Sequence, residues 1–303
     1  MENDINGVII VNKHAGVTSH DIVAKIRRLY GTKKVGHTGT LDPMATGVLP
    51  ILIGRAAKAA EYLVSDSKRY VAEIKLGIET DTEDITGKIL KTSDTLPGKT
   101  EFFRVCKEFV GEIYQTPPMY SALKVGGKKL VDLAREGKEV ERTPRKIEIK
   151  SILPEEVSEK EGIYTLDVEC SKGTYIRTLC ADIGKKLGCG AAMSSLERTR
   201  SGSFDINNAY TICELENMTP EQRASIVRPV ETLFSSLPAV TLDDFYARLC
   251  RSGCEIYQYK IKTAYPVDEF LRICDKNGFF ALGKVREYES GSAIKAVKIF
   301  NLL

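Results

Sequence analysis

The order of apolar and polar positions along the chain predicts that strands and helices alternate. Unbroken apolar runs or strict alternation predict three strands: GVIIVNK (7–13), VLPILIG (48–54) and KRYVAEIKLG (68–77). Apolar residues at helical spacing predict two helices between them: TSHDIVAKIRRLYG (18–31) and RAAKAAEYLVS (55–65). Thr18 or Ser19 is placed to cap the first helix, and Gly31 to end it.

The same pattern recurs later and then changes. A strand from Tyr164, a turn at Gly173 and a helix from Tyr175 to Leu187 repeat the interleaving. After about residue 238 a short helix precedes compact strands, with the hairpin signal Asn277-Gly278 between them. We therefore expect two domains, with a boundary near residue 238 and a small β-rich domain after it.

Composition indicates the broad class of protein. Apolar residues make up 43% of the 303 positions and charged residues 28%, as in ordinary globular proteins, and no apolar run approaches the length of a membrane span. The start, MENDINGVIIVNK, resembles neither a secretory signal nor a transit peptide, so we expect a soluble, cytoplasmic protein.

The distribution of basic residues along the chain is more informative than the net charge. The net charge of +3 alone indicates little, but basic residues gather in 25–34, 123–129 and 142–150. Each cluster alone fits a solvated face, whereas three clusters in one half of the chain fit a surface that follows the phosphates of a nucleic acid.

Several common sites are disfavoured. The eight cysteines form no CxxC pair, and Cys250 and Cys254 lack a nearby histidine, so we expect reduced thiols and no zinc site. The glycines of residues 36–47 lack the phosphate-loop spacing. DTEDITG (81–87) lacks the oxygen ligands of a calcium loop, and three histidines offer few candidates for a catalytic triad.

The segment GHTGTLDPMATGVLPILIG (36–54) holds a single carboxylate, Asp42. One interpretation is an Asx turn ahead of Pro43. The other is covalent chemistry, because an aspartate with an ordinary pKa of about 3.9 is already ionised near neutral pH and needs no base to become a nucleophile.

Five blocks, in the same order as in a known family, resemble the TruB-type tRNA pseudouridine synthases. Besides GHTGTLDPMATGVLP they are KRYVAEIKLGIETDTEDITG, QTPPMYSALK, CSKGTYIRTL and MSSLERTRSGSF, which together span roughly residues 5 to 205. The tail is similar, through DKNGFFALGKV, to the RNA-binding PUA domain, a small barrel that many members carry. The resemblance implies an α+β fold, with a catalytic domain over 1–237 built on a mixed central sheet with flanking helices, and a PUA-like RNA-binding domain over 238–303.

The resemblance implies that the chain isomerises uridine to pseudouridine at position 55 in the T-loop of tRNA. It implies no metal and no organic cofactor, a target base flipped out of its stack, and Asp42 as the nucleophile that attacks either the uracil ring or the ribose. We expect the T-arm of tRNA as partner, no membrane, no obligatory protein partner and a monomer.

The resemblance also implies roles for single residues. Tyr70 would stack on the uracil and help remove its C5 proton, and Arg177 would pair with Asp42. The remaining matches are His37, which would hold the extruded loop, Tyr175 and Leu196, which would line the uracil pocket, and Lys13 and Asp84, near RNA or the active-site loop. From local sequence alone, core packing would suit Tyr70, Tyr175 and Leu196, a turn would suit His37, and solvent exposure would suit Arg177.

Three positions depart from the family pattern, and two other functions stay open. Asn12 and His14 stand where members usually carry an acid and a proline, and Glu197 stands where they carry an arginine. One alternative is a relative from the guide-RNA branch that depends on protein partners, although TDTEDITG favours the stand-alone bacterial type. The other is an RNA-binding folding helper.

Overall fold

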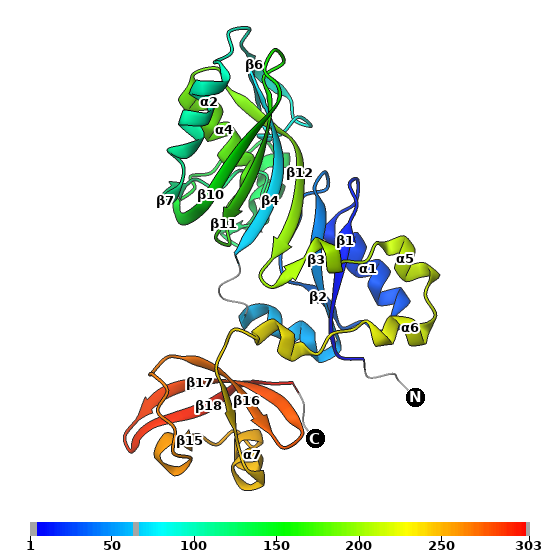
Figure 1. The fold of residues 1–303 in the computed structure, drawn as a ribbon, viewed down its shortest axis with the longest axis vertical. Helices are drawn as coiled ribbons and strands as arrows, with labels where there is room; N and C mark the ends of the chain where they lie inside the picture. The colour runs from blue at the N-terminus through cyan, green and yellow to red at the C-terminus, as the bar shows by residue number, and fades with distance from the viewer. Residues whose placement is uncertain (1–4, 63–66, 301–303) are drawn as a thin grey trace.

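The computed structural model describes residues 5–62 and 67–300, which form a nine-stranded and a five-stranded β-sheet with helices around them, and two two-stranded hairpins (Figure 1). The large sheet runs β1-β3-β12-β4-β11-β10-β7, with β2 paired to β3 and β13 paired to β12. Its strands are β1 (Gly7–Lys13), β2 (Val35–His37), β3 (Thr46–Ile53), β4 (Lys68–Leu76), β7 (Gly111–Gln115), β10 (Arg145–Ser158), β11 (Ile163–Cys170), β12 (Ala191–Ser201) and β13 (Phe204–Asp205). The pair β3–β12 is parallel and the other pairs are antiparallel, so the expected mixed sheet and α+β fold are confirmed.

Helices and short hairpins surround this sheet. Two small hairpins extend from it: β5 (Ile78–Thr80) with β6 (Ile89–Thr92), and β8 (Lys124–Val125) with β9 (Lys128–Lys129). The helices are α1 (Ser19–Leu29), α2 (Lys99–Lys107), α3 (Leu130–Arg135), α4 (Ile176–Leu187), α5 (Ile212–Asn217) and α6 (Pro220–Ser225), with 3₁₀ turns η2 (Ile206–Asn208) and η3 (Val230–Phe234). In Figure 1, α2 and α4 lie together beside β10, whereas α1, α5 and α6 lie at the opposite end, near β1.

The C-terminal elements form a second sheet with its own core. Its strand order is β14-β16-β17-β18-β15, with bounds β14 (Ala239–Thr241), β15 (Ile256–Tyr257), β16 (Phe270–Asp275), β17 (Gly278–Tyr288) and β18 (Gly291–Ile299), and it carries α7 (Asp244–Arg251) and η4 (Gln258–Lys260). The expected hairpin is confirmed, because β16 and β17 pair antiparallel up to Asp275 and Gly278. A separate apolar cluster packs Ala59 and Phe234, which lie outside both sheets, against Leu282 of β17 and against Phe300. The division of the chain into domains at residue 238 stays a prediction.

One predicted helix has a different form. Residues Gly54–Tyr62 form the 3₁₀-helix η1, not an α-helix, and residues 63–65 of the predicted stretch lie outside the described residues. The buried Ala56 and Ala59 are three positions apart, which matches the three-residue turn of a 3₁₀-helix. Small side chains at this spacing let the backbone pack against the sheet.

The junction of β3 and β12 fixes where the site can form. These strands pair in parallel at Glu197↔Thr46 and Arg198↔Gly47. Gly47 has φ +101°, and a Cβ atom there would lie 2.3 Å from the backbone oxygen of Arg198, so the strands meet only because this residue is glycine. The contact brings the loop before β3 beside β12 and β4.

Candidate active site

The loop that carries Asp42 lies between β2 and β3 and is held from both sides. The Ser19 hydroxyl, at the start of α1, accepts from the Leu41 amide at 2.9 Å and donates to the Leu41 carbonyl at 3.2 Å. The Pro43 carbonyl accepts from the Gly16 amide at 2.9 Å and from Lys13 Nζ at 3.2 Å. Because both neighbours of Asp42 are fixed through their backbone, its side chain projects from a rigid base.

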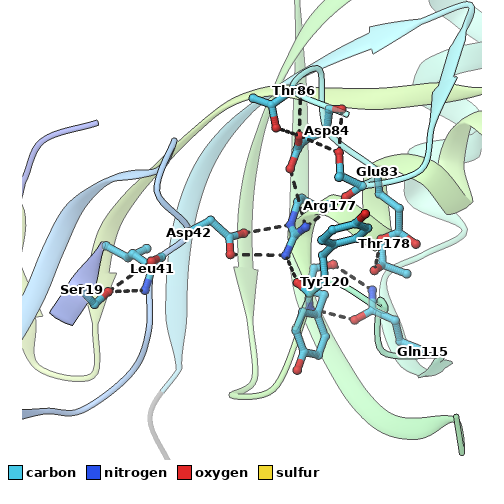
Figure 2. A network of polar contacts seen from close by, with 12 residues as sticks. Ser19, Leu41, Asp42, Glu83, Asp84, Thr86, Gln115, Tyr120, Arg177 and Thr178 are labelled. Atoms are coloured by element: carbon cyan, nitrogen blue, oxygen red, sulfur yellow. Dashed lines mark hydrogen bonds and ion pairs between the residues drawn. The ribbon is translucent and has the colours of Figure 1, made fainter. Parts of the chain in front are cut away.

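Asp42 closes its turn through its main chain. The Ala45 amide donates to the Asp42 carbonyl at 3.1 Å, so the turn does not need the carboxylate. The carboxylate faces Arg177 instead: Arg177 Nε lies 2.9 Å from Oδ2, and Nη2 donates to Oδ1 at 3.3 Å (Figure 2). This two-point contact is the geometry in which a guanidinium orients a carboxylate most firmly.

Arg177 lies in the first turn of α4, and the start of that helix is itself anchored. The Gln115 side-chain amide accepts from the Tyr175 backbone amide at 2.8 Å and donates to its carbonyl at 3.0 Å. The Arg177 guanidinium also donates to the carbonyls of Thr82, at 3.0 Å, and Tyr120, at 2.7 Å. A fully engaged guanidinium cannot turn away from Asp42, and solvent exposure, one of the sequence-based alternatives, is wrong because Arg177 is buried.

Asp84 lies on the far side of Arg177. Its Oδ2 is 3.6 Å from Arg177 Nη1, and its Oδ1 accepts from the Thr86 amide at 2.9 Å and from the hydroxyls of Thr82 and Thr86. The turn that carries Asp84 is joined to β12, since Met193 donates to Glu83 and Ile85 donates to Met193. The carboxylates of Asp42 and Asp84 therefore both contact the guanidinium of Arg177, Asp42 from one side and Asp84 from above in the view of Figure 2.

Burial sets the proton affinity of the site. It raises the pKa of Asp42 above its ordinary value, and the charge of Asp84 adds to this, while Arg177 and Lys13 act in the opposite direction. Burial also lowers the pKa of Lys13 to about 8. Lys13 Nζ donates to the carbonyls of His14 and Val17 as well as Pro43, so this lysine acts as a tie between two loops.

A cavity of about 290 Å³ opens over Asp42. Tyr70 from β4, Tyr175 from the start of α4 and Leu196 from β12 line it with Asp42 and Arg177. The chemistry of this wall is mixed, with aromatic and aliphatic faces around one carboxylate and one guanidinium. Such a cavity suits a flat polar ring that must face a charged group.

The sequence-predicted residues fall into two sets. Five of them line the cavity: Asp42, Tyr70, Tyr175, Arg177 and Leu196. Lys13 and Asp84 lie behind it, bonded to the backbone next to Asp42 and to Arg177. His37 is not part of the lining; it lies on β2, where its ring is 5.7 Å from that of His20, and burial lowers its pKa.

Two contributors were missed from the sequence. Gln115 orders the start of α4, and no local pattern marks it. Arg198 is fully buried beside Tyr70, its partner across β12 and β4. A signal for Arg198 was present, since alternation along a strand puts it on the same face as Leu196.

Other kinds of site find no support in the described part of the chain. Across residues 5–62 and 67–300, no three His, Cys, Asp or Glu side chains are grouped so that they could hold a metal ion. In the same residues, no helix is long and apolar enough to cross a membrane.

Comparisons with known proteins agree with each other. Residues 27–176 match the profile described as TruB family pseudouridylate synthase (N terminal domain), and residues 177–235 match tRNA pseudouridylate synthase B C-terminal domain. The protein named tRNA pseudouridine synthase B of Geotalea uraniireducens (strain Rf4) is 50% identical over 312 residues, which cover 98% of each chain. The protein of the same name from Alkaliphilus oremlandii (strain OhILAs) is 42% identical over 99% of each chain.

Solved structures give the same fold. A chain from the crystal structure of a Cbf5-Nop10-Gar1 complex superimposes with a TM-score of 0.74 at 27% identity, covering 99% of this chain and 86% of that chain. A chain from the structure of an H/ACA RNP bound to a substrate RNA containing 2'-deoxyuridine gives 0.72 at 26% identity, covering 97% and 85%.

Proposed function

The chain belongs to the TruB family of pseudouridylate synthases and isomerises uridine to pseudouridine in tRNA, and we propose that its target is position 55 in the T-loop, with Asp42 as the nucleophile. The observation that carries this proposal is the two-point contact of Arg177 with the only carboxylate that lines the cavity in the described residues. That contact favours the ionised form of Asp42 and aims it at the space where a base would lie.

The chemistry follows from the cavity's groups. Asp42 attacks either the uracil ring or the ribose while the N1–C1′ bond breaks, and no general base is needed because the nucleophile is an anion. The freed ring turns, a C5–C1′ bond forms, and the bond between Asp42 and the nucleoside breaks, which restores the carboxylate. C5 then gives up its proton with the help of Tyr70, and N1 takes up a proton from solvent. Tyr70 and Leu196 supply the faces against which the ring stacks.

Substrate access requires that the base leave its stack. A cavity of about 290 Å³ holds a single nucleotide, not a paired one, so the uridine has to flip out at a cost of a few kcal/mol. An exposed loop such as the T-loop offers such a base more readily than a helix does. His37 is proposed to hold this extruded loop, and Tyr175 to line the uracil pocket with Leu196.

The C-terminal sheet is proposed to add RNA contacts as a PUA-like domain. We propose that the chain acts in the cytoplasm as a monomer, with the T-arm as partner and no obligatory protein partner. The solved neighbours at 26–27% identity come from assemblies, whereas the relatives named for tRNA are 40–50% identical, which favours the stand-alone enzyme over the guide-RNA alternative.

The test is to incubate the purified chain with an unmodified tRNA transcript and to map pseudouridine by carbodiimide primer extension. One product, at position 55, is expected. A transcript with cytidine at that position is the matched control and should yield none. Pseudouridine at another position, or a requirement for an added guide RNA or protein, would contradict the proposal.

A further inference from the structure

Arg198 is a buried cation on β12, directly opposite Tyr70 of β4. Its residue is 0% exposed, and its guanidinium donates through Nε to the Val48 carbonyl at 2.7 Å and through Nη2 to the Gly39 carbonyl at 3.2 Å. Its Nη1 atom is also buried, and among the described residues it has no acceptor in hydrogen-bonding geometry. Burying an arginine with one donor left over is costly, and an apolar side chain would fill the same space without that cost.

The neighbour on the next strand is Tyr70. Arg198 in β12 and Tyr70 in β4 are direct cross-strand partners, so their side chains leave the sheet on the same face. Burial raises the pKa of Tyr70, and the charge of the neighbouring Arg198 guanidinium opposes that rise. The phenol is therefore neutral near pH 7 and lies against a permanent positive charge.

Arg198 also reaches the loop that bears the carboxylate. Gly39, which accepts from Nη2, is three residues before Asp42. A Cβ atom at Gly39 would lie 3.7 Å from Arg198 Nη1, so this glycine passes directly over the unpartnered donor. One guanidinium thus contacts the strand that carries Tyr70 and the loop that carries Asp42.

We propose that Arg198 is a positioning residue that sets the geometry between Tyr70 and Asp42 across the cavity. It holds the loop through Gly39, and its free Nη1 proton bonds to the Tyr70 oxygen when a base enters and the ring settles against it. The inference rests on the proposed function, because it assigns Arg198 to the uridine isomerisation. It predicts that Arg198 acts on the chemical step through Tyr70.

A double-mutant cycle tests this directly. Single-turnover rates at saturating tRNA are measured for Arg198→Met, Arg198→Lys, Tyr70→Phe and the combinations. With Tyr70 present, Arg198→Met should lower the single-turnover rate at least about tenfold, and tRNA affinity should change less than about threefold. The rate of Arg198→Lys should lie between those of the wild type and Arg198→Met. In the Tyr70→Phe background, Arg198→Met should lower the single-turnover rate less than about threefold, because the hydroxyl that Arg198 is proposed to contact is absent.

A matched control and an activity-independent measurement complete the design. Arg69→Lys alters an exposed arginine that pairs with Asp167 beside Tyr70 and should leave the rate unchanged. In protein labelled with [ζ-¹³C]tyrosine, the Tyr70 signal, assigned by its loss in Tyr70→Phe, should move in Arg198→Met and stay in Arg69→Lys.

Two results would overturn the inference. Equal losses in both backgrounds would make Arg198 merely structural, and an unmoved Tyr70 signal would remove the contact on which the inference depends. If Arg198→Met does not fold, Arg198→Lys carries the cycle. If the wild-type chain made no pseudouridine, the proposed function would be wrong. The Tyr70 signal would still show whether Arg198 contacts the Tyr70 ring.

Discussion

Burial and three ionisable neighbours decide whether Asp42 carries its charge. Burial and the carboxylate of Asp84 work against ionisation, whereas Arg177 and Lys13 favour it, and the pKa of Asp42 ends above its ordinary value. A raised pKa makes a carboxylate less stable as an anion and hence a better nucleophile once it is ionised. The raised pKa also makes the activity of the site more sensitive to acid.

The first prediction is an acid limb in the rate of the chemical step. The reactive form exists above the pKa of Asp42, so activity should be full at higher pH and fall as pH drops through that pKa. Because the pKa is raised, the fall should begin at higher pH than an ordinary aspartate, near 3.9, would give. Single-turnover rates between pH 4.5 and 8, with tRNA binding followed in parallel, check this. A rate that stays flat to about pH 4.5 would be inconsistent with it.

The second prediction concerns Arg177→Lys. Lysine keeps the charge but loses the planar fork that contacts both oxygens of Asp42 and two carbonyls, so the carboxylate is held less firmly. The single-turnover rate should fall about a hundredfold while tRNA affinity stays within about threefold. Lys185→Arg, an exchange between the same residue types at the exposed end of α4, is the control and should have no effect. A wild-type rate in Arg177→Lys would rule out the orienting role.

At the scale of elements, sequence patterns predicted what depends on local burial. The alternation in β4 appears unchanged in the structure, and Thr18 caps α1 through a capping box with Asp21. The 3₁₀ form of η1 could not be predicted, because an alanine-rich stretch has high α-helix propensity and only contact with the sheet selects the tighter turn.

The site was harder to predict than the elements. Asp42 and Arg177 are 135 positions apart, and no periodicity connects a loop with a distant helix start, so only family resemblance placed them together. Arg198 was missed because its role arises from strand pairing with Tyr70, which depends on register.

The third prediction tests the junction of β3 and β12. Gly47→Ala should lower the thermal midpoint by about 5 °C or more, because the new Cβ atom would meet the Arg198 backbone and the residue must also keep φ +101°. Gly126→Ala is the matched control, since Gly126 has φ +58° with nothing within 4 Å, and it should show the smaller cost of backbone strain alone. Equal shifts for the two variants would mean that the strands do not depend on this close approach.

At the scale of the whole molecule, the second sheet meets the preceding part of the chain through a small apolar contact made by η1 and η3. Phe234, just before the second sheet, packs against Phe279 and Phe300, and the Tyr62 hydroxyl donates to the Val297 carbonyl at 3.2 Å. The cavity over Asp42 is lined entirely by residues before position 197. Within residues 5–62 and 67–300, the C-terminal sheet therefore contributes no side chain to the lining of this cavity.

The fourth prediction is that a chain ending at residue 237 folds and keeps the chemistry but binds tRNA more weakly. Its dissociation constant should rise about tenfold, or about 1.4 kcal/mol, while the rate at saturating tRNA changes little. Full-length Phe234→Ser is the control, because it disturbs the same packing without removing RNA contacts. If the truncated chain bound tRNA as tightly as the full chain, the RNA-binding assignment would be wrong.

The central claim, that the Asp42 carboxylate performs the isomerisation, is tested most directly by Asp42→Asn. Asparagine keeps the size of the side chain and serves a turn equally well, but it removes the charge and the nucleophile. The measurement is tritium release from tRNA labelled at C5 of uridine, alongside a filter-binding titration. The variant should bind tRNA like the wild type and release no tritium above background; release near the wild-type rate would contradict the account.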